Sequence, residues 1–409
     1  MKEKLNPYNV RDGKEMEVRH KDTGELYAGE WAVKSMDEDD FITIGRYKNQ
    51  FSENRSQPAH IPVGEFEDLT VITGSGESNK RNVMNNIEYQ VIKTGSSVVH
   101  ITYTEEEFRS FLDVIPEERT GDVLCISPSD SEKYNVGFNI LQNPASEDHP
   151  DYEEVVSEIT DSCISLLKQG SYDWSGGRVN GLTETIVEEL IRADRQFDIV
   201  DLNRIIVEEE SLQAFSENYV DDVTIAFTEE VFEPVLKSVQ QWTQSMIARQ
   251  MTADSESEFN LYDAITSNKV VVIDFSNCRN SGVLTSFVCA RLRCIDKVLE
   301  DGLEPFVFFD RFPTRNGYNS STVSDTENIR YVMTVDKLTD YEAKTRGMIK
   351  NSGNVISFKC SMDRSEASTI SLIHNVEPMD VIHTGRNEFF SEISTTDGQK
   401  SGDSVKLSA

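Results

Sequence analysis

Residues 74–81 have the types and order that could hold a phosphate group. They read GSGESNKR, between an apolar run at 69–73 and a helical pattern at 80–94. A phosphate-binding loop in that place reads G-x-x-x-x-G-K-[ST]. Its backbone N–H groups wrap the phosphates, its lysine reaches the β/γ oxygens, and its hydroxyl residue holds Mg²⁺. The candidate nucleotide-binding residues are Gly74, Ser75, Gly76, Asn79, Lys80 and Arg81.

Two positions of this candidate loop depart from the pattern. Asn79 replaces the second glycine, although asparagine tolerates the positive φ that the loop needs. Arg81 replaces the hydroxyl residue, and a guanidinium cannot ligate Mg²⁺ because it only donates hydrogen bonds and is positively charged. A plain glycine turn followed by a solvated Lys80 is the alternative that these residues alone leave open.

A second candidate position follows the apolar run EPFVFF. Asp310 ends this run and Arg311 comes next. An aspartate at a strand tip can hold Mg²⁺ through water, so Asp310 is the candidate metal residue and the one catalytic candidate. A general base for the attacking water, usually glutamate, is expected next, and arginine cannot serve as one. The alternative role for Asp310 is to cap a loop.

The segments that must position these residues alternate between two patterns. Short apolar, β-branched runs lie at 69–73, 97–103, 122–126, 269–275, 305–309, 329–335 and 354–358. Segments of helical period lie at 80–94, 104–113, 284–300 and 338–350. Continuous apolar runs of this length are typical of strands buried on both faces. The pattern therefore predicts an α/β fold with a mostly parallel sheet covered by helices.

Composition along the chain predicts how it is organised. No strand-like run occurs between about 151 and 262, whereas DYEEVVSEITDSCISLLKQG in that segment is amphipathic, which predicts a helical insertion. The predicted regions are a small β-rich N-terminal region at 1–65, the first part of the core at 66–150, the helical insertion at 151–262, the second part of the core at 263–393 and a disordered tail at 394–409.

The net charge bears on environment and partners. The chain carries a formal charge of −32 over 409 residues. Such a surface suits concentrated salt, because at molar ionic strength a Debye length of roughly 3 Å screens the self-repulsion. We therefore expect a halophile, and a cytoplasmic or virion-internal location. No Lys/Arg run offers a face to phosphate backbones, so DNA would need a local patch. The apolar runs are too short for a membrane span.

The order of these segments resembles the HerA/FtsK branch of P-loop ATPases. Within that branch it is similar to the type IV secretion and conjugation coupling-protein group of archaea and their viruses. The resemblance covers roughly residues 60–370 and rests on GSGESNKR, IPEER…SPSD…VGFN, EPFVFFDRF and VISF…D…EA. It implies a RecA-like P-loop core with a helical domain, a hexameric ring that moves DNA, and ATP and Mg²⁺ as candidate cofactors. The implied partners are further copies of the chain, or an active ATPase relative, and DNA.

The chain differs from that family at the positions that bind and hydrolyse the nucleotide. Asn79 and Arg81 stand where Gly and Ser/Thr are expected, and Arg311 stands where the catalytic Glu is expected. Glu327 aligns with an arginine that reaches a neighbour's nucleotide, and Asp336 with a glutamine that senses phosphate. Each such group is worth orders of magnitude in rate, so their joint loss should leave hydrolysis near background.

The hypothesis is a catalytically inactive, ATPase-like protein with degenerate nucleotide motifs. It would be a structural or regulatory subunit of a DNA-translocation, conjugation or virus-packaging apparatus. Two alternatives stay open. One is an active DNA-translocating ATPase with a reworked site, in which Lys80 and Arg81 contact phosphate and Asp310 holds the metal. The other is a structural virion or interaction protein that binds no nucleotide.

Overall fold

Seven strands have the positions that the apolar runs predict. They are β5 (Leu69–Thr73), β6 (Val98–Thr102), β7 (Val123–Ile126), β8 (Val270–Asp274), β9 (Phe306–Phe309), β10 (Arg330–Val335) and β11 (Asn354–Phe358). The computed structural model describes residues 10–11, 14–15, 41–47, 58–62, 69–75, 80–127, 139–168, 177–193, 197–208, 215, 259–278, 281–300, 302–312, 326–341, 346–347, 349, 354–358, 360, 364–374, 378–383, 388–393 and 405–408.

These seven strands are neighbours in one sheet, in the order β11-β5-β10-β9-β6-β8-β7. Every pairing among them is parallel. Six of the seven are buried along their whole length, β7 being the exception at the edge. The prediction of an α/β fold with a parallel sheet buried on both faces is therefore confirmed.

Four antiparallel strands extend the sheet beyond β11. They are β12 (Glu388–Ile393), β13 (Val405–Ser408), β3 (Phe41–Tyr47) and β4 (Pro58–Pro62), which complete an eleven-stranded sheet of the described residues. A further pair, β1 (Val10–Arg11) and β2 (Lys14–Glu15), forms its own ladder. The predicted β-rich region at 1–65 thus joins the main sheet through β3 and β4.

The prediction of a disordered tail at 394–409 is wrong for residues 405–408, which form the strand β13. β13 pairs with β12 on one side and with β3 on the other, where Leu407 lies opposite Phe389 and Tyr47. An edge strand presents unpaired N–H and C=O groups, and β13 satisfies those of both neighbours. The four residues of β13, VKLS, contain no continuous apolar run. The composition of the segment therefore did not indicate that it pairs with β12 and β3.

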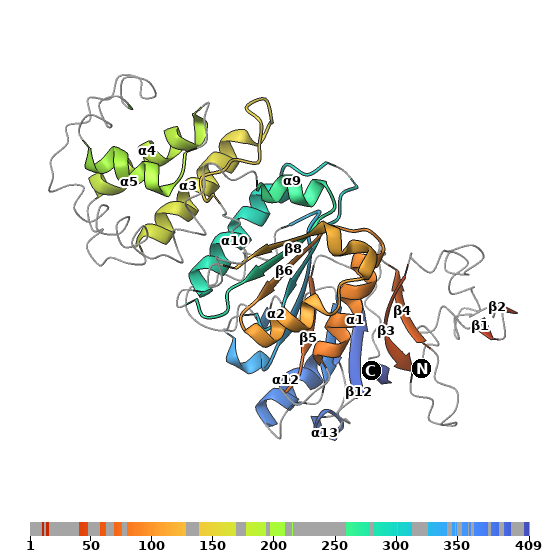
Figure 1. Cartoon of the computed structure of the whole chain (residues 1–409). Helices are drawn as coiled ribbons and strands as arrows, with labels where there is room; N and C mark the ends of the chain where they lie inside the picture. Colours follow the sequence, from red (N-terminus) through yellow and green to blue (C-terminus); the bar gives the residue numbers. More distant parts are fainter. Residues whose placement is uncertain are drawn as a thin grey trace.

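Helices cover both faces of the parallel sheet (Figure 1). On one face, α1 (Lys80–Lys93) and α2 (Glu105–Leu112) pack on side chains such as Ile72 and Phe308. On the other face, α10 (Ser281–Asp296) packs on the alternate side chains, such as Val71 and Phe309. Alternation along each strand thus divides the core into two layers. Two further helices are α12 (Arg364–His374) and α13 (Pro378–Ile382).

Most described residues of the predicted insertion at 151–262 lie in three helices, α3 (Tyr152–Lys168), α4 (Gly177–Arg192) and α5 (Ile199–Val207). A fourth helix, α9 (Leu261–Thr266), begins at the end of that range and continues beyond it. In Figure 1, α3, α4 and α5 lie together at one end of the molecule, with α3 beside α10. Arg293 of α10 pairs with Glu158 of α3, Nε to Oε1 2.6 Å, and so ties this group of helices to the core.

The remaining described helical segments are short. They are the 3₁₀ helices η3 (Glu117–Asp122) and η5 (Leu338–Asp340). The helix predicted at 338–350 begins with η5, and most of its later residues lie outside the described ranges. Within the described part of the chain, no helix combines the length and apolar character needed to cross a bilayer.

Candidate nucleotide-binding site

The candidate residues meet where the parallel strands end. Because the strands are parallel, the carboxyl ends of β5, β10, β9 and β6 lie at one edge of the sheet, where ligands bind in open α/β folds. Gly74 follows β5, Lys80 begins α1, Asp310 follows β9 and Asp336 follows β10. Gly76 and Asn79 lie in residues 76–79, outside the described ranges, so their predicted part in the loop stays a prediction.

Lys80 is buried and turned toward β10. Its side chain is 7% exposed. The ammonium donates to the backbone oxygens of Gly74 at 3.0 Å and Val335 at 3.1 Å, and it forms an ion pair with the Asp336 carboxylate. The predicted lysine therefore sits at the loop that should hold phosphate, but its three hydrogen bonds are made within the chain. The alternative of a solvated Lys80 is wrong, because burial has removed its side chain from water.

Arg81 reaches across to the end of β9. Its Nε lies 3.0 Å from Oδ2 of Asp310. Its two terminal nitrogens lie 3.2 Å from Glu106 and 3.2 Å from Glu107, both on α2. The first two residues of α1 thus form ion pairs at the ends of two different strands. Lys80 pairs with Asp336 after β10, and Arg81 pairs with Asp310 after β9.

Asp310 is held in place from β10. The Thr334 hydroxyl donates to Asp310 Oδ1 at 3.1 Å and accepts the backbone N–H of Arg311 at 2.8 Å. Arg311 itself has φ of 63°, a left-handed conformation that a residue with a Cβ seldom adopts. The two bonds to Thr334 fix this turn, and so fix where the Asp310 carboxylate points.

Glu107 joins the two arginines. Its Oε1 lies 3.2 Å from a terminal nitrogen of Arg81 and 3.4 Å from Nε of Arg311, while Oε2 accepts the Tyr103 backbone N–H at 3.1 Å. The Glu107 side chain has no exposure, and that of Arg311 is half exposed. Two guanidinium groups therefore converge on one buried carboxylate beside Asp310.

Burial shifts the pKa of two groups in opposite directions. Desolvation raises the pKa of Glu107, and the nearby Asp310 raises it further, while the Tyr103 N–H and the two arginines act against this shift. Desolvation also lowers the pKa of Lys80, against the opposing effect of the Asp336 carboxylate. For each group burial is the largest effect on the pKa, and the partners of opposite charge act against it.

These side chains do not fit a magnesium ion held as P-loop proteins hold it. Mg²⁺ requires oxygen ligands, one from the residue after the lysine and one from the strand-tip aspartate. Arg81 offers no oxygen. Both Asp310 oxygens are already engaged: Oδ2 forms an ion pair with Arg81 and Oδ1 accepts from Thr334. Among the described residues, no group of three or more His, Cys, Asp or Glu side chains is arranged to hold a metal.

The structure gathers most, but not all, of the predicted site. It brings Gly74, Lys80, Arg81, Asp310 and Arg311 to one edge, and Ser75 follows Gly74 in the described chain. Asp336, aligned with the phosphate-sensing glutamine, touches Lys80. Glu327 does not join them. It precedes β10 and donates its N–H to Asp296 at the opposite edge of the sheet.

Sequence reasoning missed Glu106, Glu107 and Thr334. The acidic triplet at 105–107 directly follows the strand run at 97–103, which is a sign that could have been used. Acidic residues are common in the first turn of any helix, however, because they favour the helix dipole. Only the strand order, with β6 next to β9, brings this triplet to Asp310.

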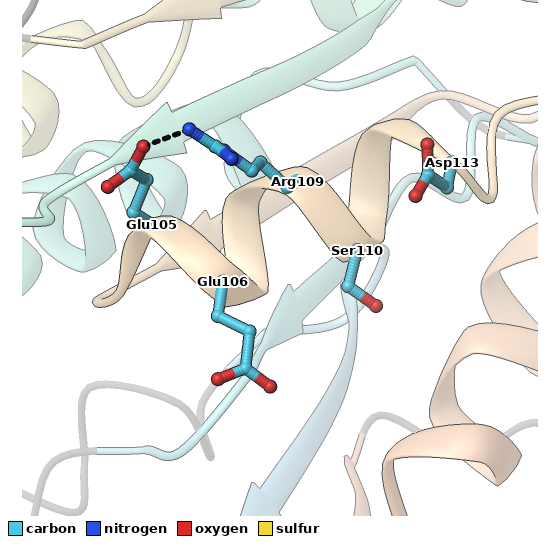
Figure 2. A pocket seen from close by; sticks show the side chains of 5 residues that line it. All are labelled: Glu105, Glu106, Arg109, Ser110 and Asp113. Atoms are coloured by element: carbon cyan, nitrogen blue, oxygen red, sulfur yellow. Dashed lines mark hydrogen bonds and ion pairs between the residues drawn. The ribbon is translucent and has the colours of Figure 1, made fainter.

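The outer face of α2 carries an open pocket that shares Glu106 with these contacts. Figure 2 shows its lining residues, Glu105, Glu106, Arg109, Ser110 and Asp113. Arg109 pairs with Glu105 there, and Glu106 extends away from that pair. Lys80 and Asp310 do not line this pocket.

Comparison with known proteins gives a fold but no close relative. No protein-family model and no curated protein sequence matches the chain. Among solved structures, the bacterial conjugative coupling protein TrwBdeltaN70 matches with a TM-score of 0.58 and 10% identity, over 86% of this chain and 86% of that one. The same protein in complex with ADP and Mg²⁺ matches with a TM-score of 0.57, 11% identity and coverage of 86% and 87%.

VirB4 of Thermoanaerobacter pseudethanolicus matches over a larger share of the chain. Its TM-score is 0.59 and its identity 12%, over 92% of this chain and 98% of that one. The chain therefore has a RecA-like α/β fold similar to that of TrwB and VirB4.

Proposed function

We propose that this chain is an ATPase-like subunit of a DNA-translocation apparatus, of the conjugation, type IV secretion or virus-packaging kind, and that it does not turn over ATP. The observation that supports the lack of ATP turnover is the contact of the Arg81 guanidinium with Asp310, whose Nε and Oδ2 atoms are 3.0 Å apart. It places a fixed positive charge where a magnesium ion would need an oxygen ligand.

The fold supports the first half of the proposal. Its structural relatives are a conjugative coupling protein and VirB4, and the former also forms a complex with ADP and Mg²⁺. We propose that this chain keeps the fold as an assembly partner, either of further copies of itself or of an active relative, and that DNA passes through that assembly. Native mass measurement with and without DNA tests this part.

The surroundings of Asp310 support the absence of turnover. Arg311 follows Asp310 and cannot act as a general base, and Glu327 lies at the opposite edge of the sheet. Lys80 is held by Asp336 and two backbone oxygens. Phosphoryl transfer depends on positioned metal, base and cations, each worth orders of magnitude in rate.

The test is ATP turnover of the purified protein in molar KCl with Mg²⁺, with and without DNA. We expect the same background rate for wild type and for Lys80→Ala. Turnover near one per second, about the lower end of the ordinary enzyme range, that is lost in Lys80→Ala would contradict the proposal.

A second candidate is an active site that has been reworked. One observation favours it: Glu107 is a buried carboxylate with a raised pKa beside Asp310, the kind of group that can act as a base. It predicts Mg²⁺-dependent turnover that is lost in Glu107→Gln and kept in Glu106→Gln. A third candidate, a protein that binds no nucleotide, predicts no heat of ATP binding in calorimetry.

We also propose that the protein works in concentrated salt. Its formal charge of −32 requires screening. The unfolding temperature should then rise steadily from low to molar KCl, by more than it does for a protein of balanced charge, because screening relieves repulsion among the surface carboxylates.

A further inference from the structure

Arg81 lies among three carboxylates at the edge of the sheet. Its guanidinium lies within 3.0–3.2 Å of carboxylate oxygens from Asp310, Glu106 and Glu107. The Asp310 side chain is 4% exposed and that of Glu107 is not exposed, whereas that of Arg81 is 26% exposed. Carboxylates that have left water to this extent need a cation close by, since an unpaired buried charge costs several kcal/mol.

Two arginines match the charges of the two buried carboxylates without a metal, while the exposed Glu106 adds a third carboxylate to the cluster. Asp310 and Glu107 carry two negative charges when ionised. Arg81 contacts both carboxylates, and Arg311 contacts Glu107 at 3.4 Å. The two guanidinium groups supply the same double positive charge that one divalent ion would supply.

We infer that Arg81 is a covalently attached replacement for a divalent cation, and that it closes a metal site which Asp310 and Glu107 would form in its absence. Mg²⁺ in proteins usually keeps several waters and takes only one or two carboxylates, so these two side chains are enough. The inference deepens the proposed function, because it says what fills the place of the metal. Its test uses no nucleotide, so its failure is separate from failure of the turnover prediction.

An ordinary surface ion pair would have exposed carboxylates. Glu106 provides the comparison within the same cluster: it lies 3.2 Å from Arg81, but its side chain is 84% exposed. Glu107 lies at the same distance with no exposure, and Thr334 and Tyr103 hold the carboxylates of Asp310 and Glu107 by further hydrogen bonds. Two of the three carboxylates are thus held by the fold, Asp310 after β9 and Glu107 in the first turn of α2.

The experiment is a Mn²⁺ titration of the full chain in molar KCl, with free Mn²⁺ measured by electron paramagnetic resonance. Mn²⁺ takes the same oxygen ligands as Mg²⁺, and the salt suppresses binding to the acidic surface. Arg81→Ser opens the site and supplies a hydroxyl. Arg109→Ser is the matched control, since it removes an exposed arginine that pairs with Glu105 on α2 (Figure 2).

We expect Arg81→Ser to bind a single Mn²⁺ at least about tenfold more tightly than wild type or Arg109→Ser, and the added change Asp310→Asn to abolish it. Its unfolding temperature should fall in EDTA and recover in Mn²⁺, while that of wild type should be the same in both. If Arg81→Ser does not fold, Arg81→Gln removes the charge at similar length and should show the same gain.

Two results would overturn the inference. One is a folded Arg81→Ser or Arg81→Gln protein that binds Mn²⁺ no better than wild type. The other is a wild-type protein that already binds a single Mn²⁺ which Asp310→Asn removes.

Discussion

The Lys80 ammonium and the Asp336 carboxylate form an ion pair that joins the start of α1 to the end of β10. Lys80 is almost fully buried and Asp336 is half exposed, so the lysine depends on this partner more than the aspartate does. A nucleotide phosphate approaching the loop after β5 would have to compete with Asp336 for the ammonium. It would compete as well with the backbone oxygens of Gly74 and Val335, to which the ammonium also donates.

The first prediction follows from that competition. Asp336→Asn keeps the shape of the side chain and removes the charge, so phosphate no longer displaces a carboxylate from Lys80. ATP affinity in molar KCl, measured by calorimetry, should rise about tenfold, which corresponds to about 1.4 kcal/mol. Asp340→Asn, an exposed change in η5, is the control and should leave the affinity unchanged. Equal affinities for wild type and Asp336→Asn would show that Asp336 does not restrain Lys80.

The second prediction compares two neighbouring glutamates that contact the same arginine. Glu107→Gln removes the buried charge that Arg81 and Arg311 share. The free energy of unfolding should fall by about 3 kcal/mol, at the lower end for breaking a buried pair because Arg81 is partly exposed. Glu106→Gln should leave it unchanged, because Glu106 is 84% exposed. Chemical denaturation in molar KCl measures both.

An unchanged stability for Glu107→Gln would be informative too. The raised pKa of Glu107 shows that burial disfavours its ionised form. If the neutral amide were as stable as the carboxylate, the arginines would be held by Asp310 and Glu106 alone, and Glu107 would have no structural part in the cluster.

The strands could be predicted from the sequence, because continuous apolar runs of this length are typical of strands buried on both faces of a parallel sheet. The sequence singled out Lys80 and Asp310 separately, and the parallel strands bring them to one edge of the sheet because parallel strands end together. It could not predict that Glu107 meets Arg81, since that contact depends on β6 lying next to β9. Nor could it predict β13, whose pairing is made by backbone groups of β12 and β3.

The third prediction concerns a buried histidine. Burial lowers the pKa of His374 on α12 to about 3, and its Nε2 lies 2.7 Å from the Ser357 hydroxyl of β11. The folded chain therefore resists protonation of this ring, whereas the unfolded chain accepts a proton below about pH 6.5. Stability from this group is complete above that value and is lost as pH falls from 6.5 toward 3.

At about pH 5 the loss from His374 should reach about 2 kcal/mol relative to about pH 7.5, at 1.36 kcal/mol per pH unit. His374→Gln removes the titration, so its unfolding temperature should fall less on acidification than that of wild type. His383→Gln, at the exposed end of α13, should behave as wild type. Parallel curves for all three proteins would mean that His374 takes up its proton while folded.

The fourth prediction concerns the joint between the core and the segment that enters the helical insertion. Arg291 on α10 is buried, lies 5.8 Å from the Phe287 ring, and donates to the backbone oxygens of Ile140 and Gln142. Burial lowers the pKa of this guanidinium to about 10, so it remains charged at neutral pH. Arg291→Met fills similar space but leaves both carbonyl groups without this donor.

Arg291→Met should lower the free energy of unfolding by about 3 kcal/mol, since each unsatisfied buried acceptor costs about 1–3 kcal/mol. Arg293→Met is the matched control on the same helix. It breaks the ion pair with Glu158 at a side chain that is 24% exposed, so its loss should be clearly smaller. The order of the two losses matters more than their absolute values. If Arg293→Met costs as much as Arg291→Met, the insertion is held to the core by the Arg293–Glu158 ion pair and not by the donation of Arg291 to residues 140 and 142.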